Sequence, residues 1–373
     1  MLGFFKYFNF FVASAVDFGA WLGLSADVTT LRIILPVGIS FYTFQTLSYT
    51  LDIYRGRLSR TKSPLDFGLF VAFFPQLVAG PIVRAREFLP QLESPRRFDR
   101  VDVRTALLVF LFGFVKKTCL ADNLSIAVDR VWDDPSSFAA SAHWLAAALY
   151  HVQVYCDFSG YSDMAIGTAA LLGYRLPVNF DFPYFARSLA GLWRRWHITM
   201  TGWFRDYIYF PSGGSLGSFW KTTRNILLVF FVTGIWHGAA WTFVLFGLLH
   251  GVLVALERSW SGGHEEQRGW WGLVYTNLVW MLCLILFRAP DLAGAASFFQ
   301  GLFSVEGSTR LPSSWLLPLI GFALVHAWMR TGRLDRGLRR LSPGAFALAL
   351  GALVALVLPW AAGNVQAFIY FQF

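Results

Sequence analysis

The strongest candidate for chemistry is His237, a histidine in the middle of a long apolar run. It lies in the run 225–256, between Gly234 and Gly238 and next to Trp236, and the run contains no acidic residue. Ionisable side chains inside membrane spans are costly and are functional candidates by default. Removal from water favours the neutral imidazole, which is the form that a general base requires. From spacing alone, a hydrogen bond to a neighbouring helix is an equally good interpretation.

A second histidine, His197, lies in an aromatic and basic segment, 192–207. A helical wheel at 100° per residue predicts an amphipathic helix at the cytoplasmic membrane interface. Its apolar stripe contains His197 with Trp193, Trp196, Met200, Trp203, Phe204 and Tyr207, and its other faces contain Arg194, Arg195, Arg205 and Asp206. The stripe points toward protein or lipid, and the arginines can contact lipid headgroups or a phosphate. Taken alone, the segment is more readily interpreted as an interfacial anchor, at about two to one.

Three further polar residues lie inside predicted spans. Asp157 and Asp163 occur in the stretch 155–164, where serine, tyrosine or backbone partners would make them structural, and we favour that interpretation over a chemical role. His250 follows His237 by thirteen positions, which is about 20 Å along a straight helix and on a distant face. The two histidines can share one reaction centre only if the helix breaks.

Several established signatures are missing from the sequence. It has no Gly-x-Ser-x-Gly elbow, no Walker-type phosphate loop and no His-Glu-x-x-His zinc helix. The soluble acyltransferase signature, His and Asp separated by four residues, is also missing, because five residues separate His151 from Asp157. Cys119, Cys156 and Cys283 lie in apolar stretches without paired spacing, so neither a disulfide framework nor a metal site is predicted. Any catalysis would therefore rest on histidines within or at the membrane.

The composition places these residues in a membrane protein. The chain has 373 residues, of which 56% are hydrophobic and 14% charged, and its mean hydropathy is +0.50. Soluble domains carry roughly 25% charged residues, and each membrane crossing requires about 20 apolar residues. We therefore predict one all-α, polytopic integral membrane domain over residues 1–373. The predicted spans are 4–24, 31–51, 65–82, 104–121, 143–173, 225–256, 270–288, 314–329 and 345–370.

Basic clusters predict how the spans are oriented. The net charge of +9 comes from short clusters between apolar runs, which fits positive-inside topology better than a nucleic-acid surface. Two such clusters flank the span 65–82 on both sides, so it enters and leaves on the cytoplasmic face. Because that span also contains Pro75, Gly80 and Pro81, we predict a re-entrant segment. The clusters are Arg55, Arg57, Arg60 and Lys62, and Arg84, Arg86, Arg96 and Arg97.

The same rule predicts a second interruption in the chain. It places an acidic loop outside and the basic segment 187–205 inside; the loop contains Asp122, Asp129, Asp133 and Asp134. A single pass over 225–256 would then place the basic loop 330–340 outside, against the positive-inside bias. A break in the span near Gly234 to Gly238 would return the basic loop 330–340 to the cytoplasmic face.

Six stretches span nearly the whole chain: 35–45, 74–82, 157–166, 193–199, 234–238 and 249–251. In this order they resemble the membrane-bound O-acyltransferase family, and within it the branch of the alginate O-acetyltransferase membrane subunit and the teichoic-acid D-alanyl transfer protein. The resemblance implies that His237 is the intramembrane active-site histidine and that His197 is the second functional histidine. Because Phe4-Phe5-Lys6-Tyr7 resembles an internal family segment, we expect the chain to lack the leading helices of the family.

The resemblance also implies the rest of the site and the reaction. No bound cofactor or metal is expected, and the donor substrate would be acetyl-CoA or another acyl thioester that enters from the cytoplasm. Arg194, Arg195 and Arg205 would contact its phosphates. The acyl group would pass through a central tunnel between re-entrant segments, for O-acylation of an exopolysaccharide such as alginate. The implied substrate-binding residues are Gln76, Asp157, Trp193, Arg194, Arg195, Trp196, Trp236 and His250.

The expected surroundings follow from the same resemblance. The partners would be the lipid bilayer, extracytoplasmic acetyltransferase proteins and the polysaccharide acceptor, with no nucleic acid, and the location would be the cell inner membrane as a multi-pass protein. Two other classes stay open. One is a transporter or flippase without covalent chemistry, for which broken helices are equally expected. The other is a non-catalytic scaffold of a polymer secretion system. Transporters commonly contain inverted repeats, and none is visible in this sequence.

Overall fold

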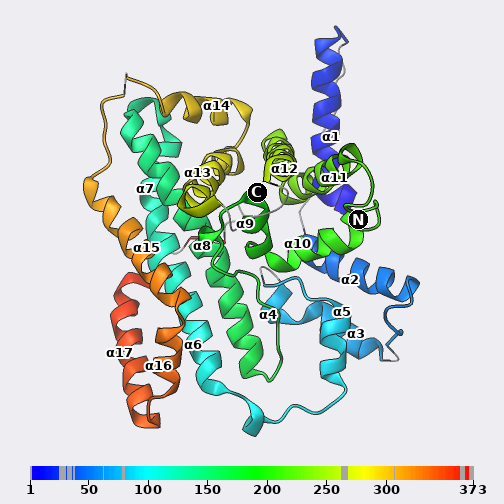
Figure 1. Cartoon of the computed structure of the whole chain (residues 1–373), viewed down its shortest axis with the longest axis vertical. Coiled ribbons are helices and arrows are strands. Elements are labelled where there is room, and N and C mark those ends of the chain that lie inside the picture. Colours follow the sequence, from blue (N-terminus) through cyan, green and yellow to red (C-terminus); the bar gives the residue numbers. More distant parts are fainter. Residues whose placement is uncertain are drawn as a thin grey trace.

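Helices make up the regular structure in the computed structural model of the chain (Figure 1). The structure describes residues 2–24, 31, 36, 38–61, 63–77, 80–261, 268–305, 307–361 and 366–368. Within these ranges there is no β-strand, only an isolated bridge between Phe138 and Thr309. Parts of the predicted stretches 31–51, 74–82 and 345–370, and Lys62, lie outside the described residues. The α-helices are α1 (Leu2–Trp21), α2 (Ile39–Tyr54), α3 (Pro64–Ala72), α4 (Phe74–Leu77), α5 (Ala85–Phe88), α6 (Val103–Phe114), α7 (Asp122–Asp133), α8 (Ala140–Leu171), α9 (Leu189–Arg195), α10 (Ile198–Phe204), α11 (Phe219–His237), α12 (Trp241–Ser261), α13 (Gly269–Arg288), α14 (Leu292–Gly301), α15 (Leu316–Arg330), α16 (Arg333–Arg339) and α17 (Pro343–Ala361).

The helix lengths fit a protein that crosses a bilayer several times. Three described helices are long and apolar enough to cross a membrane, namely α12 over Trp241–Trp260, α13 and α17. At 32 residues, α8 is about 48 Å long, which exceeds a hydrocarbon core of about 30 Å. It packs against α6, α7 and α13 near the centre of the molecule, with α15 to α17 on one side and α1 on the other (Figure 1). The predicted all-α, polytopic membrane architecture is confirmed.

The long apolar run around His237 is divided into two helices, as the sequence predicts. α11 ends at His237, Gly238 is extended (φ −162°) and α12 begins at Trp241. The two helices pack against each other. A Cβ atom added to Gly234 would lie 2.4 Å from the carbonyl oxygen of Phe243. The close crossing of α11 and α12 therefore requires glycine, because a side chain would push the two backbones apart.

The span 65–82 is also interrupted. One extended residue separates α3 from the single turn α4. Beyond α4, the backbone N–H of Ile82 donates to Oγ1 of Thr199 at 2.9 Å, and Arg84 forms an ion pair of 2.5 Å with Asp206. This broken stretch is therefore attached to α10 and to the π-helical turn that follows it, η6 (Arg205–Tyr209).

The prediction of an acidic loop after residue 121 is wrong. The helix continues from α6 through a π-helical segment, η3 (Val115–Ala121), directly into α7. Asp122 is buried, and its carboxylate lies 2.6 Å from Nζ of Lys117. Hydropathy falls at this point because charges are present, but opposite charges offset one another inside the protein, so the helix does not have to end.

We expect Gly234→Ala to destabilise the α11–α12 crossing by about 1–3 kcal/mol, because its methyl group would overlap the Phe243 carbonyl. The measurement is thermal unfolding of the detergent-purified protein. The matched control is Gly321→Ala in α15, where an added Cβ meets nothing within 4 Å. Equal melting temperatures for the two variants would contradict this account of the crossing.

Candidate active site around Trp236

His197 lies at a break between α9 and α10 and is fully buried. Its backbone has φ 45°, a left-handed conformation that costs a non-glycine residue about 1–2 kcal/mol. The prediction of one amphipathic helix at the interface is therefore wrong. The predicted stripe nevertheless faces the protein, since all its members lie in the core: Trp193, Trp196, Met200, Trp203, Phe204 and Tyr207. Strain of this kind is found where surrounding contacts hold a functional residue in place.

Asn179 supplies those contacts. Its backbone carbonyl accepts from the N–H of Ile198 at 2.9 Å, and its side-chain Oδ1 lies 3.1 Å from Nδ1 of His197. The same Oδ1 accepts from Oγ1 of Thr199 at 2.9 Å, while Nδ2 donates to Oγ of Ser162 at 3.1 Å. One amide therefore connects α8 to the strained turn at His197. Asn179 was not among the predicted site residues, because no spacing signal in the sequence links it to His197.

The Asn179 contact determines which nitrogen of His197 carries the proton. An amide oxygen can only accept, so Nδ1 of the neutral imidazole is the donor and Nε2 has the lone pair. Nε2 is buried and has no hydrogen-bond partner among the described residues. His197 is thus arranged to accept a proton or a hydrogen bond through Nε2.

His237 ends α11, and a lysine from the first helix is attached beside it. Nζ of Lys6 donates to the carbonyl oxygen of Trp236 at 2.6 Å and to that of His237 at 3.1 Å. The last carbonyls of a helix have no partner within the helix, and a cation stabilises this end. Lys6 therefore stabilises the helix end that carries His237. The sequence offered a signal, a lysine within an apolar span, but we assigned Lys6 no role.

The two histidines meet at one indole ring. The ring centroid of Trp236 lies 4.9 Å from that of His237 and 5.9 Å from that of His197. Trp236 also stacks on Phe44, with ring centroids 5.3 Å apart, and Phe44 stacks on Trp203, with ring centroids 4.3 Å apart. The structure thus brings His197, His237 and Trp236 together in a buried cluster, although 40 residues separate the histidines in the sequence.

Because the helix breaks after His237, His250 also lies near this cluster. The Phe246 ring is 6.2 Å from His237 and 4.4 Å from His250. Nδ1 of His250 bonds to the carbonyl of Phe246 at 2.9 Å, so it too presents Nε2 as an acceptor. Trp193 and Trp280 pack against His250 at 5.5 Å and 5.2 Å. Trp196 completes this wall through Trp280, at 5.0 Å.

The other predicted binding residues lie elsewhere. Gln76 is buried in α4 and donates to the carbonyl oxygen of Phe70 at 2.7 Å, within its own broken stretch. Arg194 is exposed, and Arg195 forms a 3.0 Å ion pair with Asp181. Among the described residues, no group of three or more His, Cys, Asp or Glu side chains is arranged to hold a metal ion. The central tunnel stays a prediction.

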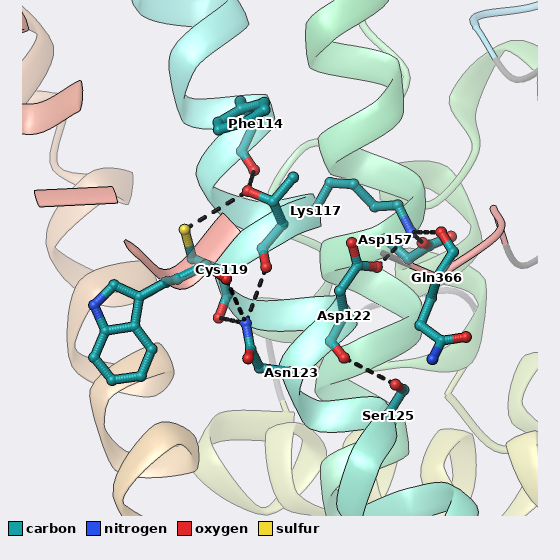
Figure 2. A network of polar contacts seen from close by, with 10 residues as sticks. Phe114, Lys117, Cys119, Asp122, Asn123, Ser125, Asp157 and Gln366 are labelled. Carbon is teal, nitrogen blue, oxygen red and sulfur yellow. Dashed lines mark hydrogen bonds and ion pairs between the residues drawn. The ribbon is translucent and has the colours of Figure 1, made fainter. Parts of the chain in front are cut away.

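Asp157 belongs to a buried ion cluster (Figure 2). Nζ of Lys117 lies 2.7 Å from Asp157 and 2.6 Å from Asp122, and it donates to the backbone carbonyl of Gln366 at 3.0 Å. All three charged side chains are at most 8% exposed. The cluster joins η3, the start of α7 and α8, which fits a structural role for Asp157. Its predicted contact with substrate stays a prediction.

Comparison with known proteins identifies the class to which this site and fold belong. A model of the membrane-bound O-acyltransferase family matches residues 55–298, more than half of the chain. The chain is 39% identical over 310 residues to the probable alginate O-acetylase AlgI of Azotobacter vinelandii, covering 82% of this chain and 60% of the relative. It is 35% identical over 341 residues to the peptidoglycan O-acetyltransferase of Helicobacter pylori, covering 82% and 63%. The chain belongs to the membrane-bound O-acyltransferase family.

A further relative is less similar to the chain. The teichoic acid D-alanyltransferase of Bacillus subtilis is 27% identical over 233 residues, covering 58% of each chain. The chain spans about three fifths of the length of the curated relatives it matches. The matched region contains His197, His237, Asn179 and the ion cluster around Lys117.

We expect Lys117→Met to destabilise the protein by about 3–5 kcal/mol, because it removes the cation from two buried carboxylates. Asp157→Asn should cost clearly less, since Lys117 keeps Asp122 as a partner. Thermal unfolding of both purified variants measures the difference. Should Asp157→Asn retain the wild-type melting temperature but lose acyl transfer, Asp157 would contact substrate and the structural interpretation would be wrong.

We expect Asn179→Ala to slow acyl transfer by about 10- to 100-fold, because it releases the imidazole that Asn179 orients. The control is Ser162→Ala, which removes the other amide hydrogen bond but leaves the Asn179–His197 contact. Rates are compared at equal amounts of folded protein. A rate that falls equally in both variants would contradict a specific role for the Asn179–His197 contact.

Proposed function

We propose that this protein is an O-acyltransferase that moves an acyl group, acetyl in the simplest case, from a cytoplasmic thioester donor to a hydroxyl group of an exported polysaccharide. The observation that carries the proposal is the contact of two buried histidines, His197 and His237, with Trp236 in a member of this family. Relatives named as alginate and peptidoglycan O-acetylases make a carbohydrate hydroxyl the favoured acceptor, alginate first.

The reaction requires one base and no redox cofactor. The imidazole of His237 removes the proton from the acceptor hydroxyl as its oxygen attacks the thioester carbonyl, which forms the new C–O bond. The tetrahedral intermediate then breaks the C–S bond, and the leaving thiolate takes the proton from the imidazolium. The products are an ester and a free thiol. General-base catalysis of this kind typically contributes about 10² to 10⁴-fold.

His197 assists the same proton transfer from a second position in the site. With Nδ1–H donated to Asn179, its Nε2 can accept a hydrogen bond but cannot donate one to a carbonyl oxygen. We therefore assign it to orienting the hydroxyl or relaying its proton, rather than to stabilising the oxyanion. The surrounding aromatic wall of Trp193, Trp196 and Trp280 excludes water, which protects the thioester from hydrolysis.

The proposed setting is the inner membrane, where the chain would act with extracytoplasmic acetyltransferase proteins. The thioester enters from the basic, cytoplasmic face and the ester leaves on the opposite side. Crossing the bilayer inside the protein allows a cytoplasmic donor to modify a polymer outside the cell. The donor is acetyl-CoA or another acyl thioester, and it is a substrate rather than a resident cofactor.

The proposal is tested with His237→Ala. We expect the O-acyl content of secreted polysaccharide to fall at least 100-fold relative to wild type, because the variant has no base at this position. Cells carrying each form are matched for the amount of protein in the membrane, and ester is measured on the purified polymer.

The matched control is His326→Ala, which removes a buried histidine of α15 that packs on Phe185 and Phe322. It should retain most of the ester. Unchanged ester in His237→Ala at equal abundance would exclude this mechanism and favour a transporter or a scaffold of the secretion system.

A further inference from the structure

A cavity lined by arginines lies outside the cluster around Trp236. Its volume is about 600 Å³. Three arginines and no acidic residue are among the described side chains that line it. The lining residues are Phe185, Ala186, Arg187, Arg195, Trp270, Leu273 and Arg330. They come from four parts of the chain: the segment leading into α9, the last residue of α9, the start of α13 and the last residue of α15.

The position of the cavity is that of a membrane interface. α13 begins at Gly269 and α15 ends at Arg330, so the cavity lies where two apolar helices leave the hydrocarbon region. Beside it, Trp270 and Trp271 are stacked with ring centroids 3.7 Å apart and are mostly exposed. Exposed tryptophans at helix ends are typical of the headgroup region. The cavity also brings two separately predicted cytoplasmic segments, 187–205 and 330–340, to one face.

The charges at this cavity are only partly neutralised. Asp181 forms an ion pair with Arg195, but it is 59% exposed, so the pair is well solvated. The guanidinium of Arg330 lies 4.5 Å over the Phe185 ring, which orients the side chain without changing its charge. Among the described residues Arg330 forms no ion pair, so its positive charge at the cavity is not offset.

The walls of the cavity are held by close packing. A Cβ atom added to Gly272 would lie 2.6 Å from the carbonyl oxygen of Arg187, so the backbone of α13 touches the segment that carries this arginine. One turn further along α13, Nδ2 of Asn277 donates to the carbonyl oxygen of Tyr184 at 3.0 Å. The arginine-bearing segment is thereby fixed against α13 before any ligand arrives.

We propose that this cavity binds the phosphate group of a ligand with net negative charge. Guanidinium groups form paired, charge-assisted hydrogen bonds with phosphate oxygens, and three of them around one cavity favour a phosphate over a single carboxylate. Two sources carry this group at a cytoplasmic interface: the headgroup of an anionic phospholipid and the phosphates of a soluble nucleotide thioester. The apolar walls formed by Phe185, Trp270 and Leu273 accept the glycerol backbone of the first or the base of the second.

Binding can be measured without acyl transfer, so this proposal stands or falls separately from the function proposed above. The full chain in detergent is titrated with phosphatidylglycerol, phosphatidylcholine or coenzyme A, and bound ligand is counted by native mass spectrometry. We expect wild type to bind phosphatidylglycerol or coenzyme A at least tenfold more tightly than phosphatidylcholine. Preference for phosphatidylglycerol identifies a lipid site, and preference for coenzyme A identifies a donor site.

The test variant is Arg187→Gln with Arg330→Gln, which should weaken the preferred ligand at least tenfold. The matched control is Arg258→Gln with Arg340→Gln, which removes the same charge from exposed arginines that do not line the cavity and should change binding less than twofold. Because a double variant can fail to fold, Arg330→Gln alone, at the exposed end of α15, is measured as well. No preference over phosphatidylcholine in wild type, or equal binding by the test and control variants, would overturn the proposal.

Discussion

Lys117 lies between two carboxylates in the interior of a membrane protein, and the cost of separating these charges fixes how the central helices pack. Its partners are Asp122, at the start of α7, and Asp157, on α8, so α7 and α8 cannot slide past each other without breaking an ion pair. Next to the cluster, a Cβ atom on Gly160 of α8 would lie 2.7 Å from the carbonyl oxygen of Gly113 in α6. These two helices therefore touch through their backbones. α8 then presents Phe158 to His197, with ring centroids 4.6 Å apart. The strained turn at His197 thus rests on a helix that an ion cluster holds in place.

His237 lies at the end of a helix rather than in its middle. A helix that ends inside an apolar region leaves carbonyl groups that lipid cannot satisfy. Lys6 meets this requirement at Trp236 and His237, which lets α11 end where the imidazole is needed. Gly234 allows α12 to return closely along α11, and that return brings His250 beside the same cluster. Irregular backbone and buried polar side chains therefore occur together, because each supplies hydrogen-bond partners that the other needs.

The sequence predicts the elements whose structure is set by nearby residues and misses those set by distant contacts. Apolar length predicts α8 and α13 to within a few residues, and the glycines around His237 predict the break after α11. The break at His197 was missed because neither glycine nor proline marks it, and the conformation is imposed by Asn179, 18 residues away. The continuous helix through Asp122 was missed because hydropathy registers the charges of Lys117 and Asp122 but not the ion pair between them. Lys6 lies more than 200 residues from the carbonyls it contacts. Contacts between distant segments, rather than composition, complete the site.

The short helix α9 connects the basic cavity to the buried cluster around Trp236. Arg195, its last residue, lines the basic cavity at the interface, and His197 follows two positions later in the buried cluster. Two residues span at most about 7 Å of backbone. The backbone of Arg195 therefore lies close to that of the histidine that is arranged to accept a proton, and Trp193 and Trp196 beside them are buried. A donor with its charge at the interface and its acyl group in the apolar interior matches this gradient in polarity, because each part then stays in the medium that solvates it best.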